Sequence, residues 1–273
     1  MASSSRKRRI VPLTIAGSDP SGGAGLQADL KIFLRFGFSG AAVPTAVTVQ
    51  SPTGVRSANP LPAALVKAQL EALLADVRPA AVKVGMLGSA DSVRVVARAL
   101  APLARRGIPI VLDPALCSSD GERLIPAADV PVLVRQLVPL AMVVMPNLQE
   151  AAEMLGRKEE DVRTNPDRAA KDLMRAGARA VLLKGGHMTS EEATDLLATR
   201  TQMILFSLPR VPRRRQVHGT GCALSAATAA LLARGQTLEQ AVQGAKEFVT
   251  AAIAGARAIG RGARQLDFLV ANG

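Results

Sequence analysis

Residues 11–36 read VPLTIAGSDPSGGAGLQADLKIFLRF, an aliphatic run followed by a glycine-rich turn and a helical segment. The run Val11–Ala16 predicts a buried strand, and Gly25–Phe36 predicts the helix that follows it. Four glycines lie at or between these two elements, more than a plain strand-to-helix connection needs. Because glycine lets a backbone approach another group closely, we expect this turn to contact a ligand.

The same alternation of strand and helix continues along the chain. Further strands are expected at Ala41–Val49, Ala81–Met86, Pro109–Leu112, Met142–Met145 and Ala180–Leu183. Further helices are expected at Ala63–Val77, Ser89–Arg105, Leu148–Leu155, Pro166–Ala176, Ala223–Arg234 and Leu238–Ala258. A hairpin at a sheet edge is expected from Ala193–Ala198 and Gln202–Leu208. This repetition predicts the α/β class, as a three-layer α/β/α sandwich with a mostly parallel central sheet.

No linker or internal repeat divides the chain, so residues 10–273 are expected to form one domain. Residues 1–9 contain a basic run in a serine-rich setting, which predicts a disordered tail. No apolar stretch reaches the roughly 18 residues of a membrane span, so no membrane partner is expected. The only cysteines, Cys117 and Cys222, provide no disulfide framework, and this favours a cytoplasmic location.

The composition limits the classes of partner. Of the 273 residues, 48% are hydrophobic, with 6 Phe and no Trp or Tyr. Ala, Leu and Val must therefore build the core, which suits buried parallel strands. The scarcity of aromatic rings argues against nucleic-acid modules that stack bases. The net charge of +12 attracts anions in general, but it comes from arginines spread over most of the chain.

A second glycine-rich turn, VHGTGCALS at residues 217–225, lies directly before an Ala- and Leu-rich helix. The first N–H groups of that helix have no partners inside it and face whatever the turn holds, which predicts an anion site. Cys222 stands at the start of the helix, where we expect the pKa of its thiol to fall below about 8.5. The alternative is a plain turn with a small buried cysteine.

Polar or glycine residues follow six of the aliphatic runs. They are Gly17-Ser18-Asp19, Gln50, Gly85-Met86, Asp113-Pro114, Pro146-Asn147 and Lys184-Gly185-Gly186-His187. Ligands of open α/β sheets bind beyond the carboxyl ends of the strands, so these residues predict one continuous cleft.

Several of these residues have two readings. Asn147 and Glu150 form a helix capping box, or Glu150 lies near a Mg²⁺-bound water beside phosphates. Lys184 needs a charged partner, which a nucleotide phosphate would provide. Asp29 lies on the first turns of its helix, either solvated or accepting from a ring amino group. His187 and His218 lack the further metal-ligating residues that a metal site needs, and they are interpreted as structural.

Five stretches carry a resemblance to a known family. They are LTIAGSDPSGGAGLQADLK (13–31), VKVGML (82–87), PNLQEA (146–151), LKGGH (183–187) and HGTGC (218–222). In this order they resemble the ribokinase-like superfamily, and within it the bacterial hydroxymethylpyrimidine/phosphomethylpyrimidine kinases of thiamine biosynthesis. The resemblance implies a ribokinase-like fold, a homodimer, and ATP-dependent phosphorylation of 4-amino-5-hydroxymethyl-2-methylpyrimidine and then of its monophosphate.

The resemblance also implies residue roles. Pyrimidine recognition would belong to Gly17, Asp29, Gln50 and Met86. The nucleotide would be bound by Asn147, Glu150, Lys184 and Thr220, with Mg²⁺ held near Glu150. The amides of Gly219, Gly221 and Cys222 would surround the transferred phosphoryl group, and Cys222 would be the candidate base. The acceptor in the second step is already ionised, so Cys222 is expected to matter less there.

Two segments depart from the family pattern. The loop Ala115–Gly121 lacks the lysine expected before its glycine, and Gln216-Val217 replaces the usual Asn-Thr. The basic cluster Arg213–Arg215 stands close to the second turn, where it would compensate for that lysine or form a solvated loop. The alternatives are therefore a pyridoxal kinase, which shares the cysteine branch, and a ligand-sensing or nucleic-acid-binding protein without catalysis. A substrate panel separates the two kinases, whereas strongly salt-dependent DNA binding without ATP turnover would favour the protein without catalysis.

Overall fold

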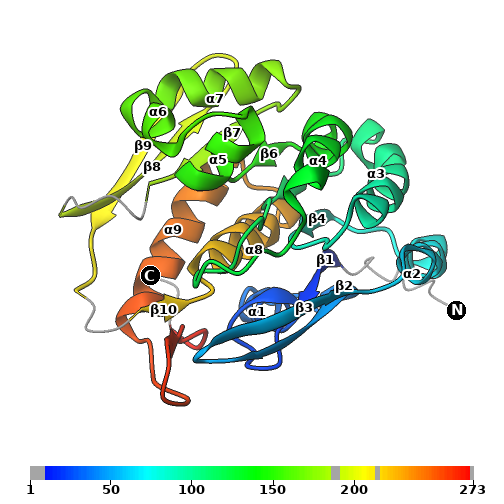
Figure 1. Ribbon diagram of the computed structural model, residues 1–273, viewed down its shortest axis with the longest axis horizontal. Coiled ribbons are helices and arrows are strands. Elements are labelled where there is room, and N and C mark those ends of the chain that lie inside the picture. Colours follow the sequence, from blue (N-terminus) through cyan, green and yellow to red (C-terminus); the bar gives the residue numbers. More distant parts are fainter. Residues whose placement is uncertain (1–9, 186–190, 213–215, 271–273) are drawn as a thin grey trace, which may run out of the picture.

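The computed structural model describes residues 10–185, 191–212 and 216–270, which contain one nine-stranded sheet (Figure 1). Its order is β3-β2-β1-β4-β5-β6-β7-β8-β9, and the strands from β2 to β7 run parallel. The central strands are β1 (Pro12–Ser18), β2 (Ala41–Ser51), β4 (Ala81–Val84), β5 (Ile110–Leu112), β6 (Val143–Val144) and β7 (Val181–Lys184). Antiparallel strands close the two edges: β3 (Gly54–Pro60), β8 (Glu192–Ala198) and β9 (Met203–Pro209).

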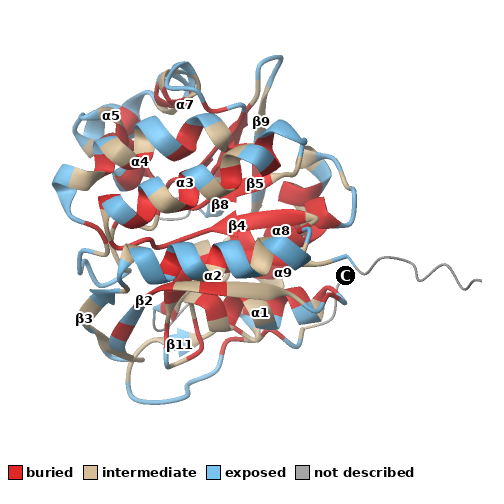
Figure 2. Cartoon of the chain, turned by 90° about the vertical axis from the view of Figure 1, so that its right-hand side faces the viewer, coloured by how far each residue is buried: buried red, intermediate tan, exposed pale blue. Residues whose placement is uncertain are grey.

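Helices cover both faces of this sheet, which confirms the expected three-layer sandwich. One face carries α1 (Gly25–Arg35), α8 (Thr220–Ala233) and α9 (Leu238–Ala254). The other carries α2 (Ala63–Asp76), α3 (Ala90–Arg105), α4 (Val130–Leu137), α5 (Leu148–Leu155), α6 (Glu159–Thr164) and α7 (Pro166–Arg175). Each layer has its own apolar core, and buried residues concentrate in the sheet and on the inner sides of the helices (Figure 2).

Helix α8 is the most deeply buried helix of the site-bearing layer. Every residue from Ala223 to Ala233 is buried, because α8 lies between the sheet, α1 and α9. A helix that is apolar on all sides belongs in a core, where its small side chains allow close packing. The N-terminus of α8 is therefore held rigidly at the strand ends.

Some elements differ from the sequence prediction. Strand β3 and the short helices α4 and α6 were not expected, and α9 ends at Ala254 instead of Ala258. Strand β3 contains Gly, Asn and Pro, and it exists through pairing with β2 at the sheet edge. Two further short elements, β10 (Val217–His218) and β11 (Arg264–Gln265), form a separate parallel pair.

The expected edge hairpin is present as β8 and β9. In the described part of the chain, no helix is long and apolar enough to cross a membrane. The basic tail of residues 1–9, His187 and Arg213–Arg215 lie outside the described residues.

Candidate active site

The two glycine-rich turns meet at the carboxyl ends of the strands. Gly219 is the N-cap of α8 with φ of 80°, a left-handed conformation that favours glycine. A Cβ placed on Gly219 would lie 1.9 Å from the carbonyl oxygen of Gly23, so the turns touch through backbone. Thr220, Gly221 and Cys222 then form the first turn of α8. This arrangement places the helix N-terminus beside the first glycine-rich turn, as an anion site requires.

Lys184 stands at this helix N-terminus. Its amine donates a hydrogen bond to Asp113 Oδ1 at 2.8 Å and lies 3.6 Å from Glu150 Oε2. A Cβ on Gly221 would lie 3.3 Å from the same amine. Asp113 also accepts from the Ser225 hydroxyl at 3.0 Å, which ties the carboxylate to α8. One cation, two carboxylates and a helix N-terminus thus share one small region.

Asn147 and Glu150 form a complete capping box at the start of α5. The Asn147 side chain accepts from the Glu150 amide, and Glu150 Oε2 accepts from the Asn147 amide, both at 2.8 Å. A parallel bridge pairs Asn147 with Lys184, so the ends of β6 and β7 hold this box beside the lysine. The two readings of Asn147 and Glu150 are therefore compatible, because the cap aims Glu150 at the charged cluster.

The two carboxylates of this cluster have pKa shifts in opposite directions. Burial raises the pKa of Glu150, and Asp113 adds to the rise while Lys184 partly offsets it. Burial alone would also raise the pKa of Asp113, but Lys184 and Lys83 outweigh it and hold that pKa below its usual range. A further cation near Glu150 would therefore favour its ionised form.

The donor set fits Mg²⁺ bound together with phosphates. In the described residues, no group of three or more His, Cys, Asp or Glu side chains could hold a metal ion alone. Mg²⁺ usually keeps several waters and takes one or two carboxylates together with substrate phosphates. Glu150 and Asp113, both within 4 Å of the Lys184 amine, supply carboxylates of that kind.

Asp29 on α1 lies in a second buried cluster, with Thr14 of β1 and Lys83 of β4. Its Oδ2 accepts from the Thr14 hydroxyl at 2.6 Å and from the Lys83 amine at 2.8 Å. Its Oδ1 is buried and has no hydrogen-bond partner. Lys83 was missed in the sequence analysis, although a lysine inside an aliphatic strand already signals the need for a buried partner.

Gly17, Gln50 and Met86 gather at the ends of β1, β2 and β4. A Cβ on Gly17 would lie 2.8 Å from Met86 Sδ, so this side chain lies directly against the strand end. Gln50 Nε2 lies 2.8 Å from His218 Nε2, and the same ring nitrogen lies 3.1 Å from Asp19 Oδ2. His218 therefore links the two glycine-rich turns to β2, which agrees with its interpretation as a structural residue.

The expected low pKa of Cys222 is wrong. Burial raises the pKa of this thiol, and the charges of Asp113 and Asp29 raise it further. Lys83 and the Gly25 backbone act in the opposite direction but do not compensate. The helix N-terminus was the only influence visible in sequence, whereas the two nearby aspartates come from distant segments.

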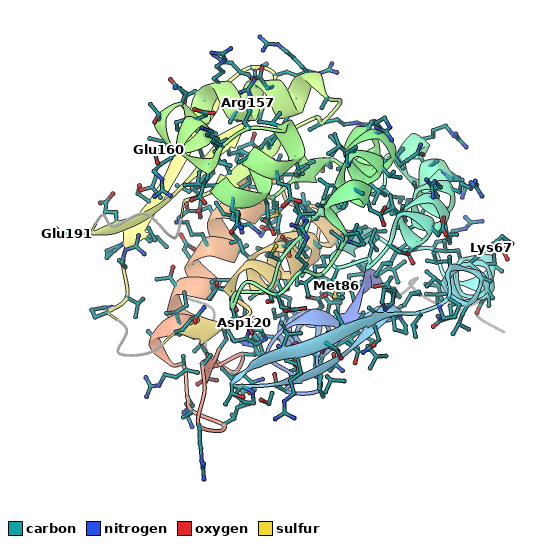
Figure 3. All side chains as sticks on the ribbon, viewed as in Figure 1. Lys67, Met86, Asp120, Arg157, Glu160 and Glu191 are labelled. Carbon is teal, nitrogen blue, oxygen red and sulfur yellow. The ribbon has the colours of Figure 1, made fainter. Side chains whose placement is uncertain are left out.

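The loop that lacks the expected lysine closes over one side of the site. Gln216 Nε2 donates to the Ser119 carbonyl at 3.1 Å, and Asp120 Oδ2 accepts from the Val55 amide at 2.9 Å. In the view of Figure 3, the exposed Asp120 and the buried Met86 lie toward the centre, whereas Lys67 lies at the outer edge. Gln216, one of the departures from the family pattern, thus anchors the other departure.

The fold and this site define a class, the ribokinase-like small-molecule kinases. Solved pyridoxal and phosphomethylpyrimidine kinases share the architecture over most of the chain. Residues 19–267 match the family described as phosphomethylpyrimidine kinase. The chain belongs to that family.

Three relatives illustrate the match. The hydroxymethylpyrimidine/phosphomethylpyrimidine kinase of Rhizobium meliloti is 43% identical over 246 residues, covering 90% of this chain and 91% of that protein. The structure of phosphomethylpyrimidine kinase from Clostridium difficile has a TM-score of 0.74 at 34% identity, covering 90% of this chain and 100% of that one. Pyridoxal kinase from Staphylococcus aureus, in complex with AMP-PCP and pyridoxal, has a TM-score of 0.83 at 30% identity, covering 96% and 94%.

Proposed function

We propose that this protein transfers a phosphoryl group from ATP to 4-amino-5-hydroxymethyl-2-methylpyrimidine and then to the resulting monophosphate, for thiamine biosynthesis. The main observation in support is the position of the Lys184 amine at the N-terminus of α8, between Asp113 and Glu150. A lysine amine at a helix N-terminus suits a polyphosphate, and membership of the family indicates which molecule accepts the phosphoryl group.

In this proposal the phosphates enter between Lys184 and the first turn of α8. Lys184 exchanges Asp113 for a phosphate oxygen, and the amides of Gly219, Gly221 and Cys222 donate to the transferred group. Thr220 begins the helix and adds its amide to that set. Asn147 positions Glu150, which would hold Mg²⁺ with the help of waters and phosphate oxygens. The ion would neutralise charge on the phosphates.

The pyrimidine lies on the β1, β2 and β4 side of the site. The free Oδ1 of Asp29 accepts from the ring amino group, and the Gln50 carboxamide offers a donor and an acceptor to the ring. Gly17 and Met86 form the apolar contact with the ring. These contacts turn the hydroxymethyl group toward Cys222.

In the first step the hydroxyl oxygen bonds to the γ-phosphorus while the bond to the β-phosphate oxygen breaks and ADP leaves. The hydroxyl proton passes to Cys222, which acts as the base in its thiolate form. In the second step the acceptor is a phosphate that is already ionised, so no such transfer is required. The raised pKa of Cys222 limits the first step at neutral pH and leaves the second unaffected.

The decisive experiment is coupled ADP release with Mg-ATP, offering the hydroxymethylpyrimidine, its monophosphate and pyridoxal separately, with products identified by mass. Turnover of both pyrimidines to the diphosphate supports the proposal. Turnover of pyridoxal alone would replace it with pyridoxal kinase activity, a candidate favoured by the Staphylococcus aureus structure that holds pyridoxal. Binding of the pyrimidine without any turnover would assign a sensing role.

We further propose a homodimer that works in the cytoplasm. The aliphatic side chains of Val47 and Val49 on β2 are 47% and 51% exposed, an apolar strip suited to a second copy. Both cysteines are free thiols, as a reducing compartment allows. Light scattering on the wild type and on Val49→Lys tests the dimer, which the lysine is expected to weaken.

A further inference from the structure

We propose that Lys83, through its ion pair with Asp29, makes the site prefer an acceptor ring that presents a hydrogen-bond donor. Lys83 is thus a positioning residue that determines specificity without touching the substrate. The inference rests on the proposed function, because it takes Asp29 to face the ring.

The geometry around Asp29 is asymmetric. Both side chains of the pair are 0% exposed, and the Lys83 amine and the Thr14 hydroxyl both donate to Oδ2. Oδ1 receives no donor although it is buried. An unpaired buried acceptor is destabilising, and a hydrogen-bond donor on a ligand would remove that penalty.

A comparable buried pair elsewhere shows no such asymmetry. Lys246 on α9 donates to Asp195 Oδ2 at 2.6 Å, and the Gly185 amide donates to Asp195 Oδ1 at 2.9 Å. Both oxygens of Asp195 are therefore satisfied by protein. A pair that only stabilises the fold can be completed in this way, so the free oxygen of Asp29 points to a ligand.

The charge of Asp29 depends on Lys83. Burial raises the pKa of Asp29 and the charge of Asp113 on β5 adds to this, whereas Lys83 on β4 and Thr14 on β1 oppose it. Cys222 on α8 also feels the charge of Asp29. Even with Lys83 in place, burial holds the pKa of Asp29 above its usual value, and removing Lys83 raises this pKa further and favours the protonated carboxyl group.

Protonation would change what the site recognises. An ionised carboxylate only accepts hydrogen bonds, whereas a protonated carboxyl group also donates. The ionised form accepts a hydrogen bond from an aromatic amino group. It disfavours a ring that turns a hydrogen-bond acceptor or an anionic oxygen toward it. Lys83 therefore selects between acceptors that share a hydroxymethyl group but differ in the neighbouring substituent.

The test compares Lys83→Met with the wild type, measuring kcat/KM for the hydroxymethylpyrimidine and for pyridoxal from about pH 6 to about pH 9. The ratio of the two values is expected to fall at least about tenfold in Lys83→Met at neutral pH, the loss of one good hydrogen bond. It recovers as pH rises through the raised pKa of Asp29, because deprotonation restores the acceptor. The wild-type ratio at each pH is the reference, so that ionisation of pyridoxal itself does not enter the comparison.

Lys246→Met is the matched control, since it breaks a buried pair whose carboxylate has no free oxygen. It is expected to lower stability and leave the ratio unchanged. If Lys83→Met does not fold, the neutral pair Asp29→Asn/Lys83→Met replaces it, with a lowered ratio that does not respond to pH.

Three results would overturn the inference while the proposed function stands: an unchanged ratio in Lys83→Met, a lowered ratio that pH does not restore, or a pH-dependent ratio in the neutral pair. Failure of the wild type to phosphorylate the pyrimidine would instead overturn the proposed function. The wild-type assay therefore separates the two failures.

Discussion

Two lysine–aspartate pairs lie near the strand ends, and they differ in their access to solvent. Lys83 and Asp29 are 0% exposed, whereas Lys184 and Asp113 are 12% and 4% exposed. The first pair leaves one carboxylate oxygen without a partner. In the second pair, both oxygens of Asp113 are used and Lys184 has Glu150 as an alternative carboxylate.

In the proposed function, this difference would separate recognition of the ring from transfer of the phosphoryl group. The buried Lys83–Asp29 pair has no solvent access through which to exchange partners, so the unpaired Oδ1 of Asp29 is held as one fixed acceptor. A lysine with some exposure and two carboxylates can release one of them when a phosphate arrives. The two halves of the site thus use the same two residue types for different purposes.

The largest expected effect is on stability, from breaking the buried Lys83–Asp29 pair. Lys83→Met is expected to lower the free energy of unfolding by about 3–5 kcal/mol at neutral pH, because it leaves Asp29 buried without a counter-ion. In Lys83→Met, the pKa of Asp29 in the folded protein lies above its value of about 3.9 in the unfolded chain. The loss of unfolding free energy therefore grows as pH rises from the unfolded-state pKa to the folded-state pKa. Urea unfolding at several pH values measures it.

A second variant checks the cause. Asp29→Asn/Lys83→Met removes both charges and is expected to lose much less stability, with no pH dependence from this site. If the single and double variants lost the same free energy of unfolding, packing of the Lys83 side chain would be responsible. The contrast between the Lys83–Asp29 and Lys184–Asp113 pairs would then not depend on charge.

The next largest effect is on catalysis, from disrupting the partly exposed Lys184–Asp113 pair. Lys184→Met is expected to lower kcat/KM for ATP by about 10²–10³-fold, the loss of one charged donor at the transferred group. The preference between pyrimidine and pyridoxal is expected to stay within about threefold, since Asp29 is untouched. Steady-state kinetics with each acceptor measures both, with the surface variant Lys67→Met as a control. A changed ring preference would show that the two pairs act as one.

Cys222 is influenced by charges from both pairs and allows a finer comparison. Cys222→Ala is expected to slow phosphorylation of the hydroxyl acceptor by about 10²-fold or more and of the monophosphate by less than about tenfold. The wild-type rate with the hydroxyl acceptor should rise with pH beyond the ordinary thiol pKa of about 8.5, since burial raises the pKa of Cys222. Equal losses for the two acceptors would refute the assignment of Cys222 as base.

The smallest expected effect is a difference between two glycine variants. Gly219 and Gly235 have φ of 80° and 90°, but only at Gly219 would a Cβ collide, with the carbonyl of Gly23. Gly235→Ala is expected to cost about 1–2 kcal/mol of stability from backbone strain alone. Gly219→Ala should cost at least about 1 kcal/mol more and reduce activity. Equal costs in thermal unfolding would mean that the turns separate easily.

Much of the fold could be predicted because the elements that build it have clear periodicity. The aliphatic strands β1, β4 and β7 and the helix α8 follow from their own residues. Strand β3 could not be predicted, since its residues have weak strand preference and its pairing with β2 decides its conformation. Helices α4 and α6 are short, and packing stabilises them more than propensity does.

The site divides in the same way. The gathering of Lys184, Glu150 and the Gly219–Cys222 turn at one edge follows from strand order, so the sequence predicted it. The partners of Lys83 and Asp113 and the pKa direction of Cys222 depend on contacts between segments far apart in the chain. Such contacts leave no local pattern, and only the three-dimensional structure shows them.

In the proposed complex, the backbone contact between Gly219 and Gly23 would couple the two ligands energetically. The proposal assigns the Gly219 turn to the phosphates and the Gly23 turn to the pyrimidine, and no side chain separates the two turns at this contact. A pyrimidine that shifts the first turn must therefore change the affinity for nucleotide. By reciprocity, nucleotide then changes the affinity for the pyrimidine by the same factor, so the order in which the ligands arrive does not alter the total binding free energy.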